Sequence, residues 1–525
     1  MHGLLYRKQF IFSNKEVTGF DLFSKSTIMA DTVCWHLYHH PDLPVCKGLN
    51  DHCELIMLGY ILDPARPDLD DQALINELTS LKSFDALLKL IGNYAGRYAI
   101  IHKDKAGIRI VNDAVGFREV YYHKTDDQIA CGSTPDILAT AFNLSVTKDP
   151  ARLAFFSSPE YKESDYVWLG FRTLYDSILH LPSNHYLDLD SLRVVRFWPK
   201  EVISRIPLEK VAVECAAILR GTLEAALNRY KLHMGITSGW DTRLLLSTAR
   251  DFKDRIFFYI NKPRSFTEDN RDLRIARELS HALDLDLHVI DIPDEVENEF
   301  RNVFYKNNIL AREKLIQVYH EVYKRNWQDT HTVSGAMGNG LARIYMHYPE
   351  GVPVTGKNMA IFAGYQNYEY PVGALQEWID EVNPLCKNLN ISLMDLYQWE
   401  QENAHWAART ASEQDIVREE ITPFNNRRLI ELFWSLEPKY RYQYNPEIYK
   451  RIISISWKEA LNFPFNPGIR SFLHKLCRLG GFEQTMYYYY KRRKFLSAIK
   501  LVTCFIEFEV MHITNFFSVD FTPIC

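Results

Sequence analysis

Residues 235–243 read Gly-Ile-Thr-Ser-Gly-Trp-Asp-Thr-Arg, a hydroxyl-rich turn that contains two glycines. The mostly apolar stretch 233–236 predicts a strand before it, and the apolar residues from Leu244 to Phe252 predict a helix after it. Such a turn directs backbone N–H groups and the positive end of a helix at one point. We therefore expect the turn to bind an anion such as a phosphate group.

Strands and helices alternate on both sides of this turn. A helical pattern at 208–230 precedes it, and a strand at 256–260, a helix at 273–283 and a strand at 287–290 follow it. This alternation predicts a parallel, doubly wound sheet. Ligands of such sheets bind outside the carboxyl ends of the strands, where the turn is expected to lie.

The N-terminal part of the chain has a different pattern. Between residues 54 and 150, short alternating runs such as 97–101 and 108–111 are separated by turn residues, which predicts antiparallel sheet. A chain of 525 residues also exceeds what one hydrophobic core supports, so we expect two domains, 1–205 and 206–525. After about residue 358, long helical patterns predict a helical lobe.

The composition is that of an ordinary globular protein, with 47% hydrophobic residues, 24% charged residues and a net charge of -5. It therefore indicates no nucleic-acid partner. The nine cysteines include no Cys-x-x-Cys pair, which argues against a disulfide framework or a zinc ribbon. No secretory signal is visible, and Lys500, Glu507 and Glu509 interrupt the apolar segment 495–517, which we interpret as a buried or interface helix. We expect a cytoplasmic protein without a membrane span.

Five residues of the turn, in matching positions, carry a resemblance to a known family: Thr237, Ser238, Gly239, Asp241 and Thr242. The turn resembles the Ser-Gly-Gly-x-Asp-Ser pyrophosphate loop (PP-loop) of the N-type ATP pyrophosphatases, which include asparagine synthetase. Ser238 departs from the pattern, because the family has a glycine there. Three stretches, 113–122, 181–187 and 196–199, resemble the glutaminase domain and linker of asparagine synthetases.

The resemblance implies the fold of both parts. Residues 1–205 would form a degenerate glutamine amidotransferase domain, an Ntn-hydrolase-like antiparallel sandwich. Residues 206–525 would form an ATP pyrophosphatase domain, a doubly wound PP-loop sheet with a helical lobe. The same resemblance extends to β-lactam synthetases and lasso peptide cyclases.

The resemblance also implies ATP and Mg²⁺ as cofactors. Asp241 would be a ligand of Mg²⁺, which binds one or two carboxylates together with phosphates and water. The alternative is that Asp241 caps the helix that follows. The residues expected to bind ATP and pyrophosphate are Thr237, Ser238, Gly239, Asp241, Thr242, Gly335 and Asn339.

A second glycine-rich stretch, residues 334–343, reads Ser-Gly-Ala-Met-Gly-Asn-Gly-Leu-Ala-Arg after an expected strand. It resembles the Ser-Gly-x-Gly-x-Asp-Glu loop of the family, which supplies a further metal-binding carboxylate. That acidic residue is missing, and Asn339 offers a neutral carbonyl in its place. The alternative is a tight turn after a buried strand without a catalytic role.

Residues 396–408 and 422–432 resemble the acceptor helix and the Pro-Phe-x-Asp-Arg turn of the synthetase domain. Glu400 aligns with the glutamate that pairs with a tyrosine to deprotonate the attacking amine, and Tyr345 is expected to be that tyrosine. A buried carboxylate with a hydroxyl partner can be tuned for such a role. The alternative places Glu400 on the solvated face of an amphipathic helix. Arg427 is expected to anchor the turn.

The sequence lacks the nucleophile of a working glutaminase. In the family a cysteine follows the initiator Met, whereas position 2 is His2 and the first cysteine is Cys34. We expect an AMP-forming amide ligase that adenylates a small-molecule or peptide carboxylate and uses ammonia or a substrate amine. The alternatives are a catalytically impaired nucleotide-binding scaffold and a tRNA-modifying PP-loop enzyme. A homodimer is left open.

Overall fold

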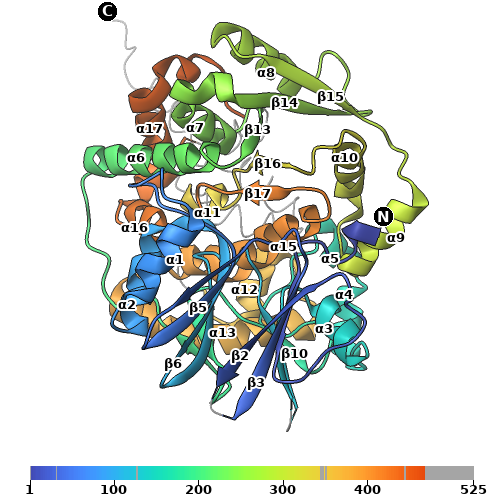
Figure 1. Ribbon diagram of the computed structural model, residues 1–525. Coiled ribbons are helices and arrows are strands. Elements are labelled where there is room, and N and C mark those ends of the chain that lie inside the picture. Colours follow the sequence, from blue (N-terminus) through green and yellow to red (C-terminus); the bar gives the residue numbers. More distant parts are fainter. Residues whose placement is uncertain are drawn as a thin grey trace, which may run out of the picture.

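The computed structural model describes residues 2–30, 32–125, 128–342, 348, 352–442 and 445–466. Two six-stranded antiparallel sheets form the N-terminal part, and a five-stranded parallel sheet lies in the part after residue 206 (Figure 1). The fold class expected from the sequence is confirmed by these sheets. The predicted Tyr345 and the segment 495–517 lie outside the described residues.

The first antiparallel sheet has the order β10-β8-β9-β1-β3-β2. Its strands are β10 Ile178–His180, β8 Tyr121–Lys124, β9 Ile129–Gly132, β1 Phe10–Ser13, β3 Val33–His39 and β2 Ser24–Ala30. The second sheet has the order β12-β11-β7-β6-β5-β4. Its strands are β12 Arg193–Arg196, β11 His185–Asp188, β7 Gly107–Asn112, β6 Ala95–Asp104, β5 Cys53–Leu62 and β4 Val45–Leu49.

The two sheets pack face to face because alternate residues of their strands are apolar. Phe12 and Leu37 of the first sheet share one buried cluster with Ile56 and Ile101 of the second. On the other face of the second sheet, side chains such as Leu55 pack under helices α1 Asp71–Thr79 and α2 Phe84–Leu90. On the outer face of the first sheet, Ile11 packs with residues of helix α3 Pro135–Phe142. The N-terminal part is therefore a sandwich with helices on both sides.

The parallel sheet has the order β15-β14-β13-β16-β17. Its strands are β15 Leu287–Ile292, β14 Ile256–Pro263, β13 Lys231–Gly235, β16 Thr330–Val333 and β17 Glu419–Ile421. The chain moves from β13 through β14 to β15 in one direction and then returns to β16 on the other side of β13. Since parallel crossovers are right-handed, this reversal places the connecting helices on both faces and creates a switch point between β13 and β16.

Helices surround this sheet. They are α6 Leu208–Leu227, α7 Trp240–Thr248, α8 Arg271–Ala282, α9 Asn298–Asn307, α10 Glu313–Lys324 and α17 Glu447–Trp457. Helices α6, α7 and α17 pack against one another, α8 packs against β14 and β15, and α10 packs against β15. The strands and helices expected at 256–260, 273–283 and 287–290 are all present, with bounds that differ by a few residues.

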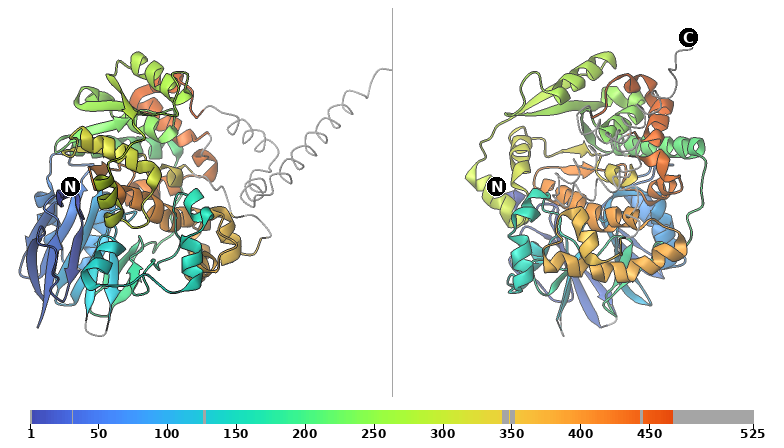
Figure 2. Two further views of the ribbon diagram at one scale, coloured as in Figure 1. Left: turned by 90° about the vertical axis from the view of Figure 1, so that its right-hand side faces the viewer. Right: turned by 180° about the vertical axis from the view of Figure 1, so that it is seen from behind.

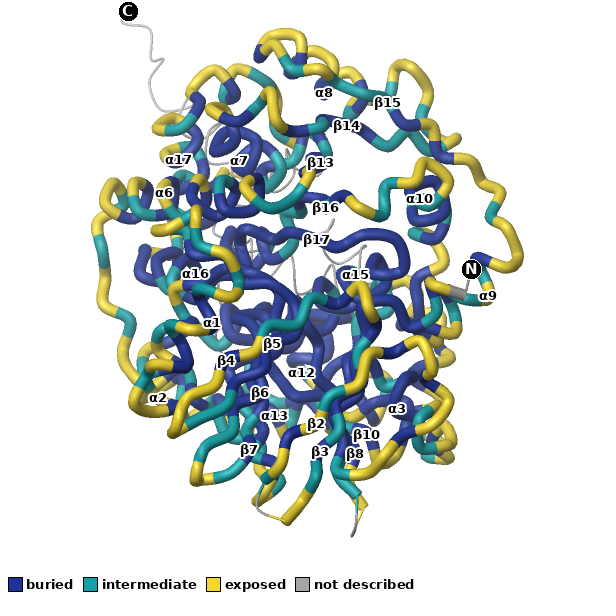
Figure 3. The backbone as a smooth tube through the Cα atoms, viewed as in Figure 1, coloured by how far each residue is buried: buried dark blue, intermediate teal, exposed yellow. Residues whose placement is uncertain are grey.

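Seen from behind, the helices expected after residue 358 lie in front of the antiparallel sheets and below the parallel sheet (Figure 2, right). They are α12 Gly356–Ala363, α13 Glu369–Leu389, α14 Leu393–Tyr397, the π-helix η4 Gln398–Asn403, α15 Ala404–Gln414 and α16 Arg427–Trp434. The tube along α15 and β17 is almost entirely buried (Figure 3). One hydrophobic core therefore runs across residue 206, from Tyr60 and Phe117 to Trp399 and Phe424. The boundary at 205/206 stays a prediction.

Among the described residues, no helix is long and apolar enough to cross a membrane.

Candidate functional site

The loop expected from the sequence to bind a nucleotide, residues 235–242 (the nucleotide loop), leaves the carboxyl end of β13 at the switch point of the sheet. Gly239 is the N-cap of α7 and provides no side-chain cap, so the first N–H groups of this helix point to the loop without a capping side chain. The hydroxyls of Thr237 and Thr242 share a hydrogen bond of 2.7 Å, and the Gly239 N–H donates to Thr237 Oγ1 at 3.1 Å. The loop is thus a closed turn at a helix N-terminus, as the sequence predicted.

Asp241 is the second residue of α7, not its cap. The hydroxyl of Tyr449, in α17, donates a hydrogen bond of 3.0 Å to Asp241 Oδ1. Burial raises the pKa of Asp241 to about 6, and the bond from Tyr449 opposes this rise. The capping alternative is therefore wrong, and Asp241 is a buried carboxyl group oriented by a tyrosine.

The second glycine loop, residues 334–341, follows the adjacent strand β16 and contacts Asp241. A Cβ at Gly335 would lie 2.8 Å from Asp241 Cβ, and one at Gly338 would overlap the Asp241 carboxylate. Tyr449 also donates to the Gly338 carbonyl at 3.1 Å. The structure therefore brings the predicted residues Asp241 and Gly335 together, and the glycines are what allow this approach.

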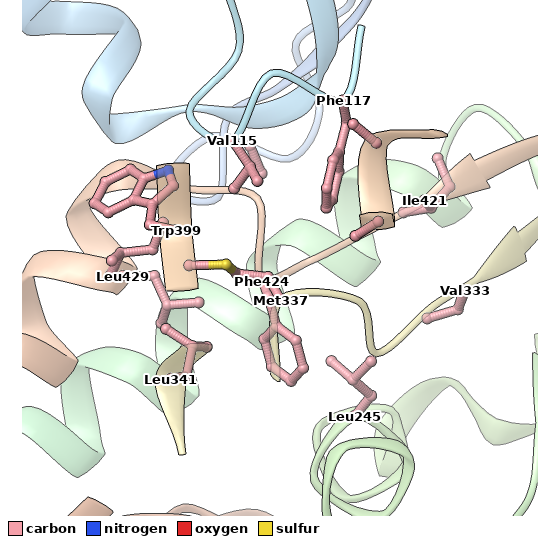
Figure 4. Close-up of a cluster of buried hydrophobic side chains, with 14 of the residues drawn as sticks. Val115, Phe117, Leu245, Val333, Met337, Leu341, Trp399, Ile421, Phe424 and Leu429 are labelled. Atoms are coloured by element: carbon pink, nitrogen blue, oxygen red, sulfur yellow. The ribbon is translucent and has the colours of Figure 1, made fainter. Parts of the chain in front are cut away.

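Apolar side chains of the second loop pack into the hydrophobic core. Helix α11 Gly338–Leu341 follows Met337, whose φ is 73°. Figure 4 shows Met337 and Leu341 packed among Trp399, Phe424 and Leu429. The second loop is therefore part of the central core and has little freedom to move away from Asp241.

The loop contains no acidic side chain at the family's position. Oδ1 of Asn339 is buried and has no hydrogen-bond partner among the described residues. Within the described ranges, no three His, Cys, Asp or Glu side chains gather as a metal site. Asp241, the loop hydroxyls and the phosphates of a nucleotide still match what Mg²⁺ requires, since it takes one or two carboxylates with phosphates and water.

Ser238, which stands where the family that the loop resembles has a glycine, makes a side-chain hydrogen bond. Its hydroxyl donates a short hydrogen bond to Asp272, in the first turn of α8. The nucleotide loop is thereby tied to the next crossover helix through a carboxylate that sequence reasoning did not single out.

Glu400 lies in the π-helix η4 and is fully buried, so the solvated-face alternative is wrong. Its carboxylate accepts hydrogen bonds from Arg196 Nη1 at 2.5 Å, Asn184 Nδ2 at 2.9 Å and Trp378 Nε1 at 3.0 Å. Although burial favours the protonated acid, the Arg196 guanidinium holds the pKa of Glu400 below its usual range. The general-base role of Glu400 stays a prediction, and these contacts are those of a carboxylate held ionised by an arginine.

Arg427 occupies the anchoring position that the sequence predicted for it. It donates a short hydrogen bond to Asn184, and its guanidinium lies over the rings of Phe197, Trp198 and Trp399. Burial lowers the pKa of Arg427 to about 10. The turn before α16 is therefore fixed to the N-terminal part.

Two elements of the site escaped sequence reasoning. One is Tyr449, in an ordinary amphipathic helix far from the loop in sequence. The other is the segment 460–466: Phe465 stacks on Trp240 at 3.6 Å between centroids, and the Asn466 N–H donates to the Ser238 carbonyl at 3.0 Å. Neither carries a local motif, because both act through contacts that only the folded chain creates.

A buried ion network joins the N-terminal part to the same region. Arg97 contacts Asp415 at 2.5 Å, Lys8 contacts Glu419 at 2.5 Å, and Arg118 pairs with Glu419. All three cations come from residues 1–205, and both carboxylates come from the chain around β17. Since the N–H of Ser334 donates to the Ile421 carbonyl at 2.9 Å, the network is coupled to the start of the second loop.

No family model and no curated protein matches this sequence. The solved structures similar to it include the glutamine-dependent NAD+ synthetase from Acinetobacter baumannii in complex with ADP, with 11% identity over 37% of this chain and 43% of that chain and a TM-score of 0.19. Others are the NH3-dependent NAD synthetase from Campylobacter jejuni (12% identity, 36% and 81% coverage, TM-score 0.19) and the glutamine PRPP amidotransferase from B. subtilis (9% identity, 59% and 89% coverage, TM-score 0.23). The match spans less than half of the Acinetobacter chain.

Proposed function

We propose that this chain is an ATP-dependent, AMP-forming ligase that joins a carboxylate to ammonia or to a substrate amine. The observation that carries the proposal is the position of Asp241. It lies at the switch point of the parallel sheet, on the helix that follows the nucleotide loop, and in contact with Gly335 and Gly338 of the second loop.

The loop residues supply what the first step of such a reaction requires. A carboxylate oxygen of the substrate attacks the α-phosphorus of ATP, a new P–O bond forms, and the bond to pyrophosphate breaks with its electron pair on pyrophosphate. N–H groups at the start of α7 and the hydroxyls of Thr237 and Thr242 are suited to stabilise the charge that develops on that leaving group.

In the second step the amine nitrogen attacks the acyl carbon of the acyl-adenylate. A C–N bond forms, the C–O bond breaks with its electron pair on AMP, and one amine proton passes to water. Asp241 is the carboxylate we assign to Mg²⁺, which would neutralise phosphate charge when bound. Tyr449 keeps that carboxylate oriented toward the loop.

The nitrogen does not come from glutamine in this proposal. His2 stands where a glutaminase of this type has its nucleophile, and Cys34, the first cysteine of the sequence, is a half-buried residue near the start of β3. The acceptor is a small-molecule or peptide carboxylate.

Titration calorimetry with Mg-ATP tests the proposal before any acid is known. We expect micromolar binding, worth about 8 kcal/mol, to the wild type and a loss of at least tenfold in affinity for Asp241→Asn. The exposed Asp329→Asn is the control and should bind like the wild type. Binding that Asp241→Asn leaves unchanged, or none to the wild type, would reject the ligase.

The scaffold alternative is favoured by one observation, the neutral Asn339 in place of the family's acidic residue. A scaffold would bind Mg-ATP without turnover. Release of AMP from a mixture of amino acids, short peptides and sugar acids with hydroxylamine as the amine would separate the two.

A further inference from the structure

A short segment after helix α17 lies against the nucleotide loop. It follows the 3-10 helix η6 Lys458–Asn462, and we name its residues 463–466 the strap. The Asn466 N–H donates to the Ser238 carbonyl at 3.0 Å. A Cβ at Gly239, the N-cap of α7, would lie 3.9 Å from Asn466 Oδ1. The end of the strap therefore borders the point where α7 begins.

Two side chains of α7 hold the strap from the side. The ring of Phe465 stacks on that of Trp240, with 3.6 Å between centroids and 7° between planes. The Arg243 guanidinium lies 4.5 Å from the centroid of the Phe465 ring. Since Trp240 and Arg243 are three residues apart in α7, they share one face of this helix, and Phe465 packs across both. The strap is thus fixed to the helix whose N-terminus faces the nucleotide loop.

Arg243 also directs both of its terminal nitrogens to the backbone of this segment. Its Nη1 donates to the carbonyls of Ala460 at 2.9 Å and Phe463 at 3.4 Å, and its Nη2 donates to that of Pro464 at 3.3 Å. A planar guanidinium has several donors in a fixed fork, so it can serve three carbonyls in one geometry. Arg243 therefore fixes the end of η6 and the start of the strap together.

Arg243 differs from the other arginines that are buried as deeply. Each of those pairs with a carboxylate, and they are Arg97, Arg118, Arg312 and Arg441. Arg243 is 1% exposed and pairs with no carboxylate of the described residues, and burial lowers its pKa to about 10. A buried cation without an acidic partner costs free energy. The three carbonyls and the Phe465 ring are the groups that offset this cost, so the charge of Arg243 is used on the strap.

We infer that the strap is a part of the nucleotide site and that Arg243 is the positioning residue that keeps it there. This inference rests on the proposed function, because it requires that the loop binds Mg-ATP. An anion site directs the N–H groups of a turn at the anion, whereas a carbonyl oxygen repels phosphate oxygens. The bond from Asn466 occupies the Ser238 carbonyl, so the docked strap leaves the N–H groups of the loop to the phosphates.

Docking of the strap and binding of the nucleotide are then linked. If the docked strap strengthens Mg-ATP binding by some factor, bound Mg-ATP stabilises the docked strap by the same factor. Arg243 and Phe465 act on affinity through the strap and need not touch the nucleotide. A role in packing alone would create no such reciprocity.

Phe465→Ala and Arg243→Met test the inference. Each removes one contact of the strap, and we expect Mg-ATP affinity, measured by titration calorimetry, to fall about three- to tenfold in either variant. Because both residues act through the same segment, the double variant should lose less than the product of the two single losses. If Arg243→Met does not fold, Phe465→Ala and hydrogen exchange of the wild type are sufficient.

Phe257→Ala is the matched control. The Phe257 ring also stacks on an aromatic ring, that of His288, with 4.2 Å between centroids and 8° between planes. It lies near the start of β14, at the end of the sheet opposite to the nucleotide loop. The variant should therefore lower Tm and keep the Mg-ATP affinity of the wild type.

Hydrogen–deuterium exchange of the wild type measures the reciprocal effect. Saturating Mg-ATP should slow exchange in the segment 460–466 by a factor similar to the affinity loss of Phe465→Ala. Unchanged exchange there while residues 235–242 become protected, or wild-type affinity in Phe465→Ala, would overturn the role of the strap and leave the ligase proposal in place. No binding of Mg-ATP to the wild type would reject both.

Discussion

The hydroxyl of Tyr449 donates a hydrogen bond of 3.0 Å to Asp241 Oδ1 across a separation of 208 residues. The same hydroxyl contacts the Gly338 carbonyl at 3.1 Å. One side chain thus joins the helix after the nucleotide loop, the second glycine loop and the late helix α17. Asp241 is oriented by the fold as a whole, not by its own loop.

Tyr449→Phe removes this hydroxyl and keeps the ring. A hydrogen bond of this kind contributes about 1 kcal/mol, so we expect Mg-ATP affinity to fall about fivefold by calorimetry. Tyr370→Phe is the control, because its hydroxyl also contacts two backbone carbonyls, those of Leu169 and Arg172. It should lose stability without losing affinity. Equal effects of the two variants on Mg-ATP binding would contradict an orienting role for Tyr449.

Gly338→Ala places a methyl group into the Asp241 carboxylate. Because the core packed behind Met337 and Leu341 resists a shift of the loop, we expect Mg-ATP affinity to fall at least tenfold and Tm to fall by several degrees. Gly373→Ala, in helix α13 with no atom within 4 Å of the new Cβ, should leave binding unchanged. An unchanged affinity in Gly338→Ala would mean that the second loop is not part of the nucleotide site.

The sequence predicted those helices, strands and turns that a pattern of neighbouring residues indicates. The turn at 235–243 and the strands β13 to β16 of the parallel sheet follow from apolar periodicity and glycine spacing, and the structure has them with small shifts in their bounds. Strand β17 was missed because three residues, Glu419 to Ile421, carry no strand pattern; they are in the sheet through pairing with β16. The surroundings of Glu400 and the contact of Tyr449 with Asp241 depend on partners far away in sequence, which no local pattern encodes.

Glu419 is the common partner of Lys8 and Arg118 at the contact between the two parts of the chain. Glu419→Gln leaves the buried Lys8 without its carboxylate and leaves Arg118 with Asp415 alone, and we expect the free energy of unfolding to fall by about 3–5 kcal/mol in urea titrations. Asp329→Asn breaks the exposed pair with Lys231 and should cost less than about 1 kcal/mol. A loss for Glu419→Gln as small as that of Asp329→Asn would show that the network does not hold the parts together.

His180 and His405 make stability depend on pH. Their rings lie 4.9 Å apart, and no described residue bonds their ring nitrogens. Burial lowers the pKa of His180 to about 3, and burial, with His180 and Arg409 nearby, holds the pKa of His405 well below its usual value. Below pH 6.5 the unfolded chain protonates both rings, whereas the folded chain keeps them neutral. Their contribution to the free energy of unfolding is therefore complete above pH 6.5 and is lost as pH falls toward 3. Each histidine adds a slope of about 1.4 kcal/mol per pH unit below pH 6.5.

His405→Phe removes one of these groups and keeps an aromatic ring of similar size. Between pH 6 and 4.5 its free energy of unfolding, measured in urea at each pH, should fall less steeply than that of the wild type, by about 1.4 kcal/mol per pH unit. The exposed His52→Phe is the control and should keep the wild-type slope. The same slope in His405→Phe and the wild type would mean that His405 is protonated in the folded chain, which requires a partner for its ring.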